Sequence, residues 1–306
     1  MKAFYADTVP LNLPPGHRFP AEKYVMLRER VFASGLFAPN DLRQAPPASE
    51  TDLRRVHTPD YVQRVLTGQL SEREIRRIGL PWSPELADRS QRAVGGAIQA
   101  CRAASAEGSG IYLGGGTHHA YPDHGEGFCV FNDVAVAGRV MLAEGLARRI
   151  LIVDCDVHQG NGTAAIFAGD PQVFILDLYG EKNFPFHKEP VSLPIPLDDG
   201  AGDDAYLEAL TQGLRRAIPQ SRAELAIYLA GADAYEGDRL GRLALTKPGL
   251  AERDRLVLDA LQRAGVPRAV VMSGGYAKNI RDSVDIHFQT IQMVTQMTTR
   301  KVSVNP

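Results

Sequence analysis

The sequence predicts a single α/β domain in which helices cover both faces of a central parallel sheet. Three observations support this fold class. Short apolar runs recur along the chain, amphipathic segments of helical length separate them, and glycine-rich polar loops follow them. Short runs that are apolar throughout are typical of strands buried on both faces of a parallel sheet. Because no linker or internal repeat interrupts the 306 residues, we expect one domain, 1–306.

The expected strands contain mainly β-branched and aliphatic residues, and they are residues 111–113, 150–153, 173–176, 225–229 and 269–272. Between them, three segments have the length and apolar spacing of helices, namely residues 132–144, 203–217 and 250–264. The first hundred residues are expected to form a helical preface. In it, Thr58-Pro59 begins one helix and Ser83-Pro84 begins a long one that reaches about Ala106.

Composition excludes several classes of protein. With 34 basic and 36 acidic residues the net charge is −2, so we expect no nucleic-acid partner. No apolar stretch is long enough to cross a membrane, so we expect no membrane partner. The first ten residues are not followed by the apolar run of a signal peptide, so we expect no secretory leader. Three scattered cysteines favour a reducing, cytoplasmic location. Arg outnumbers Lys by 27 to 7, a bias typical of GC-rich bacterial genes.

Candidate metal ligands follow two of the expected strands. Asp154, Asp156 and His158 alternate after the second strand, so in an extended chain their side chains point to one side. Asp233 follows the fourth strand, and the carboxyl ends of parallel strands meet at one edge of a sheet. Asp156, His158 and Asp233 would leave one position open for water, as in a catalytic zinc site. The alternative is that these acidic residues cap the next helix.

Two histidines and a tyrosine are candidates for acid–base and oxyanion chemistry. His118 and His119 follow a glycine run, and adjacent side chains diverge, so they suit proton transfer beside a metal better than joint ligation. Tyr276 comes after the glycines that follow the last expected strand and could donate its hydroxyl to a developing oxyanion. Hydrogen-bonded loop histidines and a packing tyrosine are the alternatives. The other histidines considered are expected to be structural or exposed: His17, His57, His187 and His287.

Five sequence blocks, in this order and spacing, resemble the zinc-dependent histone deacetylase superfamily, which has the arginase/deacetylase fold. The blocks are residues 115–119, 127–129, 154–162, 231–233 and 273–276. Three details are similar to the class IV branch. These are Gln159 and Asn161 in place of His and Asp, the run 236–241, and Ser-Gly-Gly-Tyr at the last block.

The resemblance implies a hydrolase that removes an acyl group from acyl-lysine, or from a related acylated amine, with metal-activated water. It implies Zn²⁺ on Asp156, His158 and Asp233. His119 is the implied general base and proton donor to the leaving amine, with His118 as its electrostatic partner. The implied role of Tyr276 is to polarise the scissile carbonyl.

Further roles are implied by the same resemblance. Asp154 would orient His118 and, together with Asp177 and Leu178, bind a monovalent cation such as K⁺. Asn161 stands behind His119 where class I enzymes have Asp, which implies a less basic His119. The implied walls of the acyl-lysine tunnel are Phe128 and Phe184, with the Gly127 carbonyl accepting from the substrate amide.

Three other functions remain as alternatives. An acetylpolyamine or other small-molecule amidohydrolase would use the same residues. A ureohydrolase of the arginase type needs two manganese ions and further bridging carboxylates, and Gln159 and Asn161 are not carboxylates. An inactive acyl-lysine binder would have lost a ligand, a histidine or the tyrosine. The sequence leaves the acyl group, the amine that carries it and the oligomeric state open.

Overall fold

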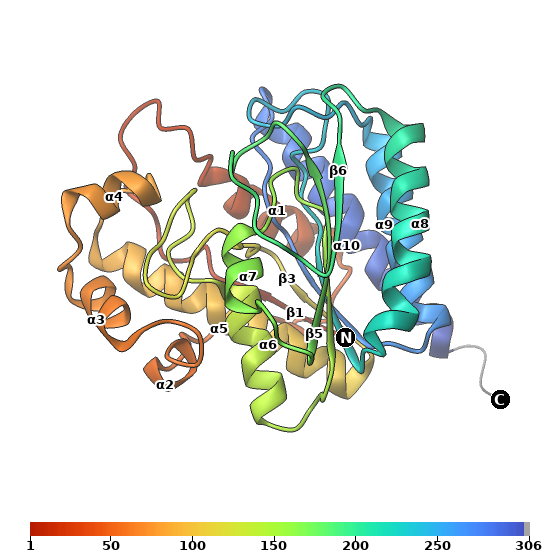
Figure 1. Ribbon diagram of the computed structural model, residues 1–306, viewed down its shortest axis with the longest axis horizontal. Helices are drawn as coiled ribbons and strands as arrows, with labels where there is room; N and C mark the ends of the chain where they lie inside the picture. The colour runs from red at the N-terminus through yellow and green to blue at the C-terminus, as the bar shows by residue number, and fades with distance from the viewer. Residues whose placement is uncertain (303–306) are drawn as a thin grey trace.

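The computed structural model describes the backbone of residues 1–302 and the side chains of residues 1–298. Its strands are β1 (Lys2–Tyr5), β2 (Leu42–Gln44), β3 (Ser109–Tyr112), β4 (Ile150–Asp154), β5 (Val173–Gly180), β6 (Leu193–Leu197), β7 (Leu225–Leu229) and β8 (Arg268–Val271). They form one eight-stranded parallel sheet in the order β2-β1-β3-β8-β7-β4-β5-β6 (Figure 1).

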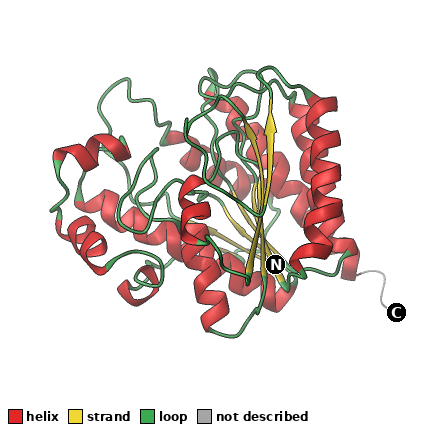
Figure 2. Cartoon of the chain, in the orientation of Figure 1, coloured by secondary structure: helices red, strands yellow, loops and turns green. Residues whose placement is uncertain are grey.

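Helices cover both sides of this sheet (Figure 2). They are α1 (Glu22–Ser34), α2 (Glu50–Leu53), α3 (Pro59–Thr67), α4 (Glu72–Ile78), α5 (Pro84–Glu107), α6 (Asp133–Ala143), α7 (Asn161–Ile166), α8 (Asp203–Ser221), α9 (Lys247–Arg263) and α10 (Ile280–Val302). Figure 1 shows α5, α6 and α7 on one side and α8, α9 and α10 on the other.

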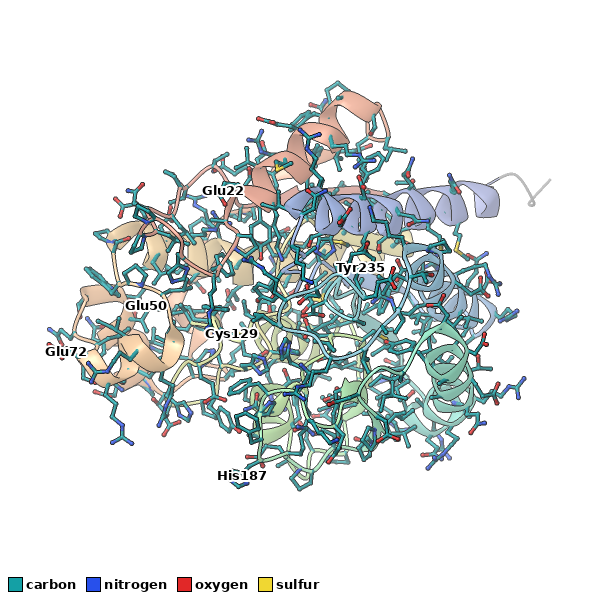
Figure 3. The ribbon with its side chains drawn as sticks, turned by 90° about the horizontal axis from the view of Figure 1, so that it is seen from above. Glu22, Glu50, Glu72, Cys129, His187 and Tyr235 are labelled. Carbon is teal, nitrogen blue, oxygen red and sulfur yellow. The ribbon has the colours of Figure 1, made fainter. Side chains whose placement is uncertain are left out.

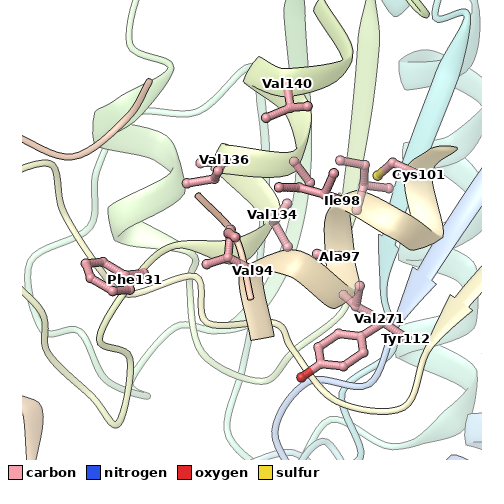
Figure 4. Close-up of a cluster of buried hydrophobic side chains, with 14 of the residues drawn as sticks. Val94, Ala97, Ile98, Cys101, Tyr112, Phe131, Val134, Val136, Val140 and Val271 are labelled. Atoms are coloured by element: carbon pink, nitrogen blue, oxygen red, sulfur yellow. The ribbon is translucent and has the colours of Figure 1, made fainter. Parts of the chain in front are cut away.

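Each face of the sheet has its own hydrophobic core, and successive strand residues belong to opposite cores. In β7, Ile227 belongs to the core that α5 and α6 complete, and Tyr228 belongs to the core that α8, α9 and α10 complete. Figure 4 shows the first core, where Ile98 of α5 and Val136 of α6 pack together with their neighbours. Burial of both faces of every central strand confirms the α/β fold predicted from the uninterrupted apolar runs.

The expectation of a purely helical preface is wrong, because the first hundred residues also supply β1 and β2. β1 has four residues and β2 has three, of which only Leu42 is buried, so both are too short for a clear strand pattern in the sequence. The sequence analysis also missed β6, whose Pro194 and Pro196 disfavour a strand. Both prolines are exposed on an edge strand, where a missing N–H costs no ladder hydrogen bond.

Predicted helix starts are confirmed by their capping hydrogen bonds. The Thr58 side chain accepts from the Tyr61 N–H, and Ser83 accepts from the Leu86 N–H, in each case with proline at the first helical position. A side-chain oxygen at this position satisfies a backbone donor that the helix leaves unpaired. None of the helices formed by residues 1–302 is long and apolar enough to cross a membrane.

The three cysteines have free thiols and are buried at separate places in the fold. Figure 3, seen from above, shows Cys129 in the interior, whereas Glu50 and Glu72 lie on helices at the periphery. Burial raises the pKa of Cys155 to about 12, so its thiol stays protonated at neutral pH. These thiols are therefore packing groups in the described structure rather than reactive ones.

Asn132 joins the helical layer to the loop that carries the two candidate histidines. Its Oδ1 accepts from the Ala135 N–H at 2.9 Å and caps α6. Its Nδ2 donates to the carbonyl of His118 at 3.3 Å, to that of Ala120 at 3.1 Å and to Thr163 Oγ1 at 3.0 Å. Because Asn132 is fully buried, water cannot replace these bonds when the side chain is removed.

We predict that Asn132→Ala lowers the free energy of unfolding by roughly 2–4 kcal/mol, the sum of a lost helix cap and unsatisfied buried acceptors. Urea unfolding followed by circular dichroism measures this change. Asn40→Ala is the matched control, because Asn40 is exposed, and it should change stability by less than about 0.5 kcal/mol. Equal stability of the two variants would contradict this role for Asn132.

Candidate metal centre and active site

Candidate ligands from two loops meet at the carboxyl edge of the sheet. Because β4 and β7 are neighbours, the loop with Asp156 and His158 lies beside the loop with Asp233. Each of the three residues offers one ligand atom, and these atoms all lie within 4.8 Å of one another. All three side chains are buried. The alternation read from the sequence therefore brings a carboxylate, an imidazole and a second carboxylate together at one point.

The surroundings of these residues fit a bound cation. Asp156 Oδ2 accepts from Ser273 Oγ at 2.7 Å and from the Gly274 N–H at 2.8 Å. By contrast, Asp233 Oδ2 is buried and accepts no well-formed hydrogen bond from the described residues, and its basic neighbour is His158 Nδ1 at 3.3 Å. A Cβ on Gly274 would lie 1.8 Å from that oxygen, so only glycine leaves room there. A carboxylate oxygen without a well-formed hydrogen bond, in a cluster of hard and borderline donors, fits Zn²⁺.

The shifted pKa values of Asp233 and His158 also fit a bound cation. Burial raises the pKa of Asp233 to about 7, with the charge of Asp156 adding to the effect. Burial opposes protonation of His158, yet hydrogen bonds and charges of the two aspartates raise its pKa to about 10. Without a bound cation, Asp233 and His158 therefore tend to hold protons, and a dication that binds there would release these protons.

The two adjacent histidines lie side by side next to this cluster. Their ring centroids are 4.2 Å apart. His118 Nδ1 contacts Asp154 Oδ2 at 2.7 Å, and His118 Nε2 lies 3.8 Å from Asp156 Oδ1. Although burial alone lowers it, the charges of Asp154 and Asp156 raise the pKa of His118 to about 9. The structure thus places the Asp154 carboxylate, which the resemblance implies as the residue that orients His118, against the His118 ring.

His119 has a different environment. Its Nδ1 lies 2.7 Å from Asn161 Oδ1, and Asn161 Nδ2 donates to Glu126 Oε1 at 2.6 Å. Burial, together with the nearby His118 and His158, holds the pKa of His119 well below its usual range. His119 is therefore neutral at physiological pH, with one ring nitrogen free of a proton. The sequence analysis missed Glu126, because nothing in the sequence links it to Asn161.

A cavity of about 780 Å³ opens onto the cluster. Phe128 and Phe184, which the resemblance implies as tunnel walls, both line this cavity, and Phe184 lies edge-on to His119 with ring centroids 5.0 Å apart. Gly127 and Tyr276 also line the cavity. Phe19, which the sequence analysis missed, packs on Phe128 with centroids 5.5 Å apart. Aromatic walls around a polar base suit a substrate with an apolar stem.

Two further hydrogen-bond sets hold parts of this cavity in place. Asp238 accepts from the Tyr276 N–H at 2.6 Å and from two N–H groups of its own turn. Gln159 donates to the Glu189 carbonyl and accepts from the Glu189 N–H, both at 2.8 Å. Gln159 therefore ties the loop after β5, which carries Phe184, to the loop that carries the candidate ligands.

The residues expected at a monovalent cation site are also buried together. Asp154 and Asp177 end up side by side on paired positions of β4 and β5, and Leu178 follows in β5. Asp177 Oδ2 accepts from the Gly160 N–H at 3.1 Å, whereas Oδ1 has no hydrogen-bond partner in the described part of the chain. Burial and the charge of Asp154 raise the pKa of Asp177 well above its usual range.

None of the four histidines expected to be structural or exposed belongs to the group of candidate ligands found among the described residues. His57 is buried and contacts the Tyr121 carbonyl and the Asn132 N–H. His17 packs on the outer part of Phe128, and His187 is exposed. His287 is buried below the Gly274-Gly275 turn and has no hydrogen-bond partner within residues 1–302.

Comparison with known proteins agrees with this geometry. The family model "Histone deacetylase domain" matches residues 17–291. A protein of Picosynechococcus, described as uncharacterized, is 45% identical over 275 residues, which is 90% of this chain and 92% of that one. The histone deacetylase-like amidohydrolase of Pseudomonas aeruginosa is 33% identical over 90% of this chain and 78% of its own length.

The same fold is found among solved structures. A histone deacetylase homologue from Aquifex aeolicus has a TM-score of 0.81 and 22% identity, covering 97% of this chain and 84% of that one. A homologue complexed with SAHA has a TM-score of 0.82 and 21% identity over the same shares. These two likenesses concern the fold.

We predict that the metal-free chain binds one Zn²⁺ and that Asp233→Ala weakens this binding at least about 100-fold, since loss of an outer partner alone costs roughly 10–100-fold. Titration against a competing chromogenic chelator measures both affinities. Asp123→Ala, which removes an exposed carboxylate, is the control and should bind zinc as the wild type does. Unchanged zinc affinity in Asp233→Ala would refute the ligand assignment.

Proposed function

The chain belongs to the histone deacetylase family, and we propose that it is a zinc-dependent deacylase that hydrolyses the amide of acyl-lysine. The observation that carries this proposal is the buried Asp156–His158–Asp233 cluster at the base of an aromatic-walled cavity, with a neutral histidine beside it. Related acylated amines are accommodated by the same chemistry. Zinc bound there would lower the pKa of a coordinated water to about 7 and polarise the carbonyl.

His119 performs the proton transfers in this proposal. Its neutral ring has a free nitrogen that accepts a proton from the attacking water. The same nitrogen then gives the proton to the departing amine, which would otherwise leave as a poor anionic group. His118, whose contact with Asp154 favours a charged ring, stabilises negative charge that develops next to it.

Tyr276 supplies a donor for the carbonyl oxygen. The Asp238 carboxylate holds the backbone of Tyr276, and the Tyr276 ring packs on Phe128 with centroids 6.0 Å apart. Held in this way, the hydroxyl needs little reorganisation as charge builds on the oxygen. Phe128 and Phe184 enclose the methylene stem of the lysine, and the Gly127 carbonyl accepts from the substrate amide.

Several finer features belong to the same proposal. Asp154, Asp177 and the main chain at Leu178 hold a monovalent cation, for which the unpartnered Asp177 Oδ1 is the supporting observation. Asn161, paired with His119, belongs to the catalytic set. Gln159 and Asn161 make the chain class IV-like, and the free thiols suit a cytoplasmic location. A ureohydrolase is disfavoured, because neither Gln159 nor Asn161 supplies the carboxylates of a second metal.

Tyr276→Phe should lower kcat on an acetyl-lysine peptide by roughly 10²–10³, the usual effect of removing one oxyanion donor. Zinc affinity should not change, and kcat/KM should fall with kcat, because the lost interaction exists only in the transition state. Tyr235→Phe removes a hydroxyl from the loop after β7, at a residue that does not line the cavity, and is the control. A fall of less than fivefold, with chemistry rate-limiting, would make Tyr276 a packing residue.

Substrate panels test the function itself. We predict that zinc-loaded protein cleaves at least one of the acetyl-, trifluoroacetyl- and myristoyl-lysine peptides. His119→Ala should be nearly inactive, with the smallest loss of rate on the electrophilic trifluoroacetyl substrate. Fluorogenic release measures the rates. Cleavage of acetylated polyamines alone would favour the small-molecule alternative. Urea release from arginine with Mn²⁺ would replace the proposal by a ureohydrolase.

A further inference from the structure

Glu126 accepts a hydrogen bond from Asn161, which in turn contacts His119. The proposed function assigns no role to this carboxylate. Two bonds form an unbroken chain, from His119 Nδ1 to Asn161 Oδ1 at 2.7 Å and from Asn161 Nδ2 to Glu126 Oε1 at 2.6 Å. His119 and Asn161 are buried, so water does not compete for these groups. We propose that Glu126 is a positioning residue that acts through the Asn161 amide to keep the proton of His119 on Nδ1.

The argument follows from which groups donate and which accept. A carboxylate offers only acceptors, so the Asn161 amide must turn its NH₂ group toward Glu126. The Asn161 carbonyl oxygen then faces His119, and Nδ1 of the neutral ring must carry the proton in order to donate to it. Nε2 is left with its lone pair, which is the state a general base requires.

The Glu126 backbone is held firmly enough for this role. The Cys129 N–H donates to the Glu126 carbonyl at 2.9 Å and closes a tight turn. Gly127 and Phe128 in that turn have φ values of 57° and 65°. The turn is fixed to the end of α4 by the Phe128 N–H, which donates to the Ile78 carbonyl at 2.7 Å. Glu126 therefore approaches Asn161 from a rigid loop that also forms the cavity wall.

Asn161 by itself could not fix the tautomer. An amide can rotate and present NH₂ instead of oxygen, which would favour the ring with its proton on Nε2 and a blocked base. Glu126 removes that freedom and also polarises the amide, so a neutral Asn161 acquires part of the effect of a carboxylate. This inference rests on the proposed role of His119 as the base.

Glu126→Gln tests it with little change in size. The Gln amide can accept or donate, so the preference that the Glu126 carboxylate imposes on the orientation of Asn161 is lost. We expect kcat to fall at least fivefold, and by about 10–100-fold in Glu126→Ala, with KM within twofold. Loss of the correct tautomer in a serine-protease triad costs about 10⁴-fold, an upper bound here. Glu181→Gln, an exposed carboxylate on another loop, is the matched control.

A charge swap provides the rescue. In Asn161→Asp/Glu126→Gln a carboxylate accepts directly from His119, and the new Gln donates to it. We expect kcat within fivefold of the wild type, whereas Asn161→Asp alone places two carboxylates together and remains impaired. If Glu126 only filled space, Glu126→Gln would match the wild type and the swap would restore nothing.

The tautomer can be observed without turnover. In metal-free protein, ¹⁵N NMR of the His119 ring should show a protonated Nδ1 in the wild type and a mixture of both tautomers in Glu126→Ala. Wild-type kcat in Glu126→Gln, or an unchanged His119 tautomer in Glu126→Ala, would overturn the proposal. A wild type that cleaves no acyl-lysine peptide would refute the proposed function instead, and the NMR result would still decide the role of Glu126.

Discussion

Burial of several carboxylates at one edge of the sheet is the constraint on which the rest of this structure depends. Asp154, Asp156, Asp177 and Asp233 are each no more than 2% exposed. Asp154 ends β4 and pairs with Asp177 within β5, and Asp156 and Asp233 lie in the loops after β4 and β7. Such charges are strongly destabilising unless cations or hydrogen bonds compensate them. His118 and His158 compensate in part, and backbone N–H groups from Val157, Gly160 and Gly274 contribute more. Asp177 Oδ1 and Asp233 Oδ2 accept no well-formed hydrogen bond from the described residues, so the protein does not fully offset the cost of burying these two carboxylates.

A second buried network supports the loops from the opposite side. The Arg253 guanidinium of α9, fully buried, donates to the carbonyls of Gly231 and Cys155. Asp254 neutralises it, and Asp254 is in turn bonded by Tyr228 and Thr290. The Arg253 guanidinium thus links the two loops that carry Asp156 and Asp233. The arrangement of the candidate ligands is therefore supported by the α9 layer as well as by the sheet.

Sequence reasoning found what depends on local pattern. Apolar runs identified the central strands, and the alternating Asp and His residues after β4 pointed to candidate ligands that the fold brings together with Asp233. It failed where local pattern is weak. β1 and β2 are too short for periodicity, and β6 contains two prolines. Glu126 was missed because its significance is a contact with Asn161, 35 residues away, which only the folded turn creates.

The central claim is that the buried carboxylates and His158 are arranged to bind one catalytic metal ion. X-ray absorption at the zinc K-edge of the zinc-loaded protein tests this most directly, because it reports the atoms around the ion. The account predicts a first shell of oxygen and nitrogen only, near 2.0–2.2 Å, with the outer-ring scattering of a single imidazole. Sulfur at about 2.3 Å, or the scattering of two or more imidazoles, would contradict it.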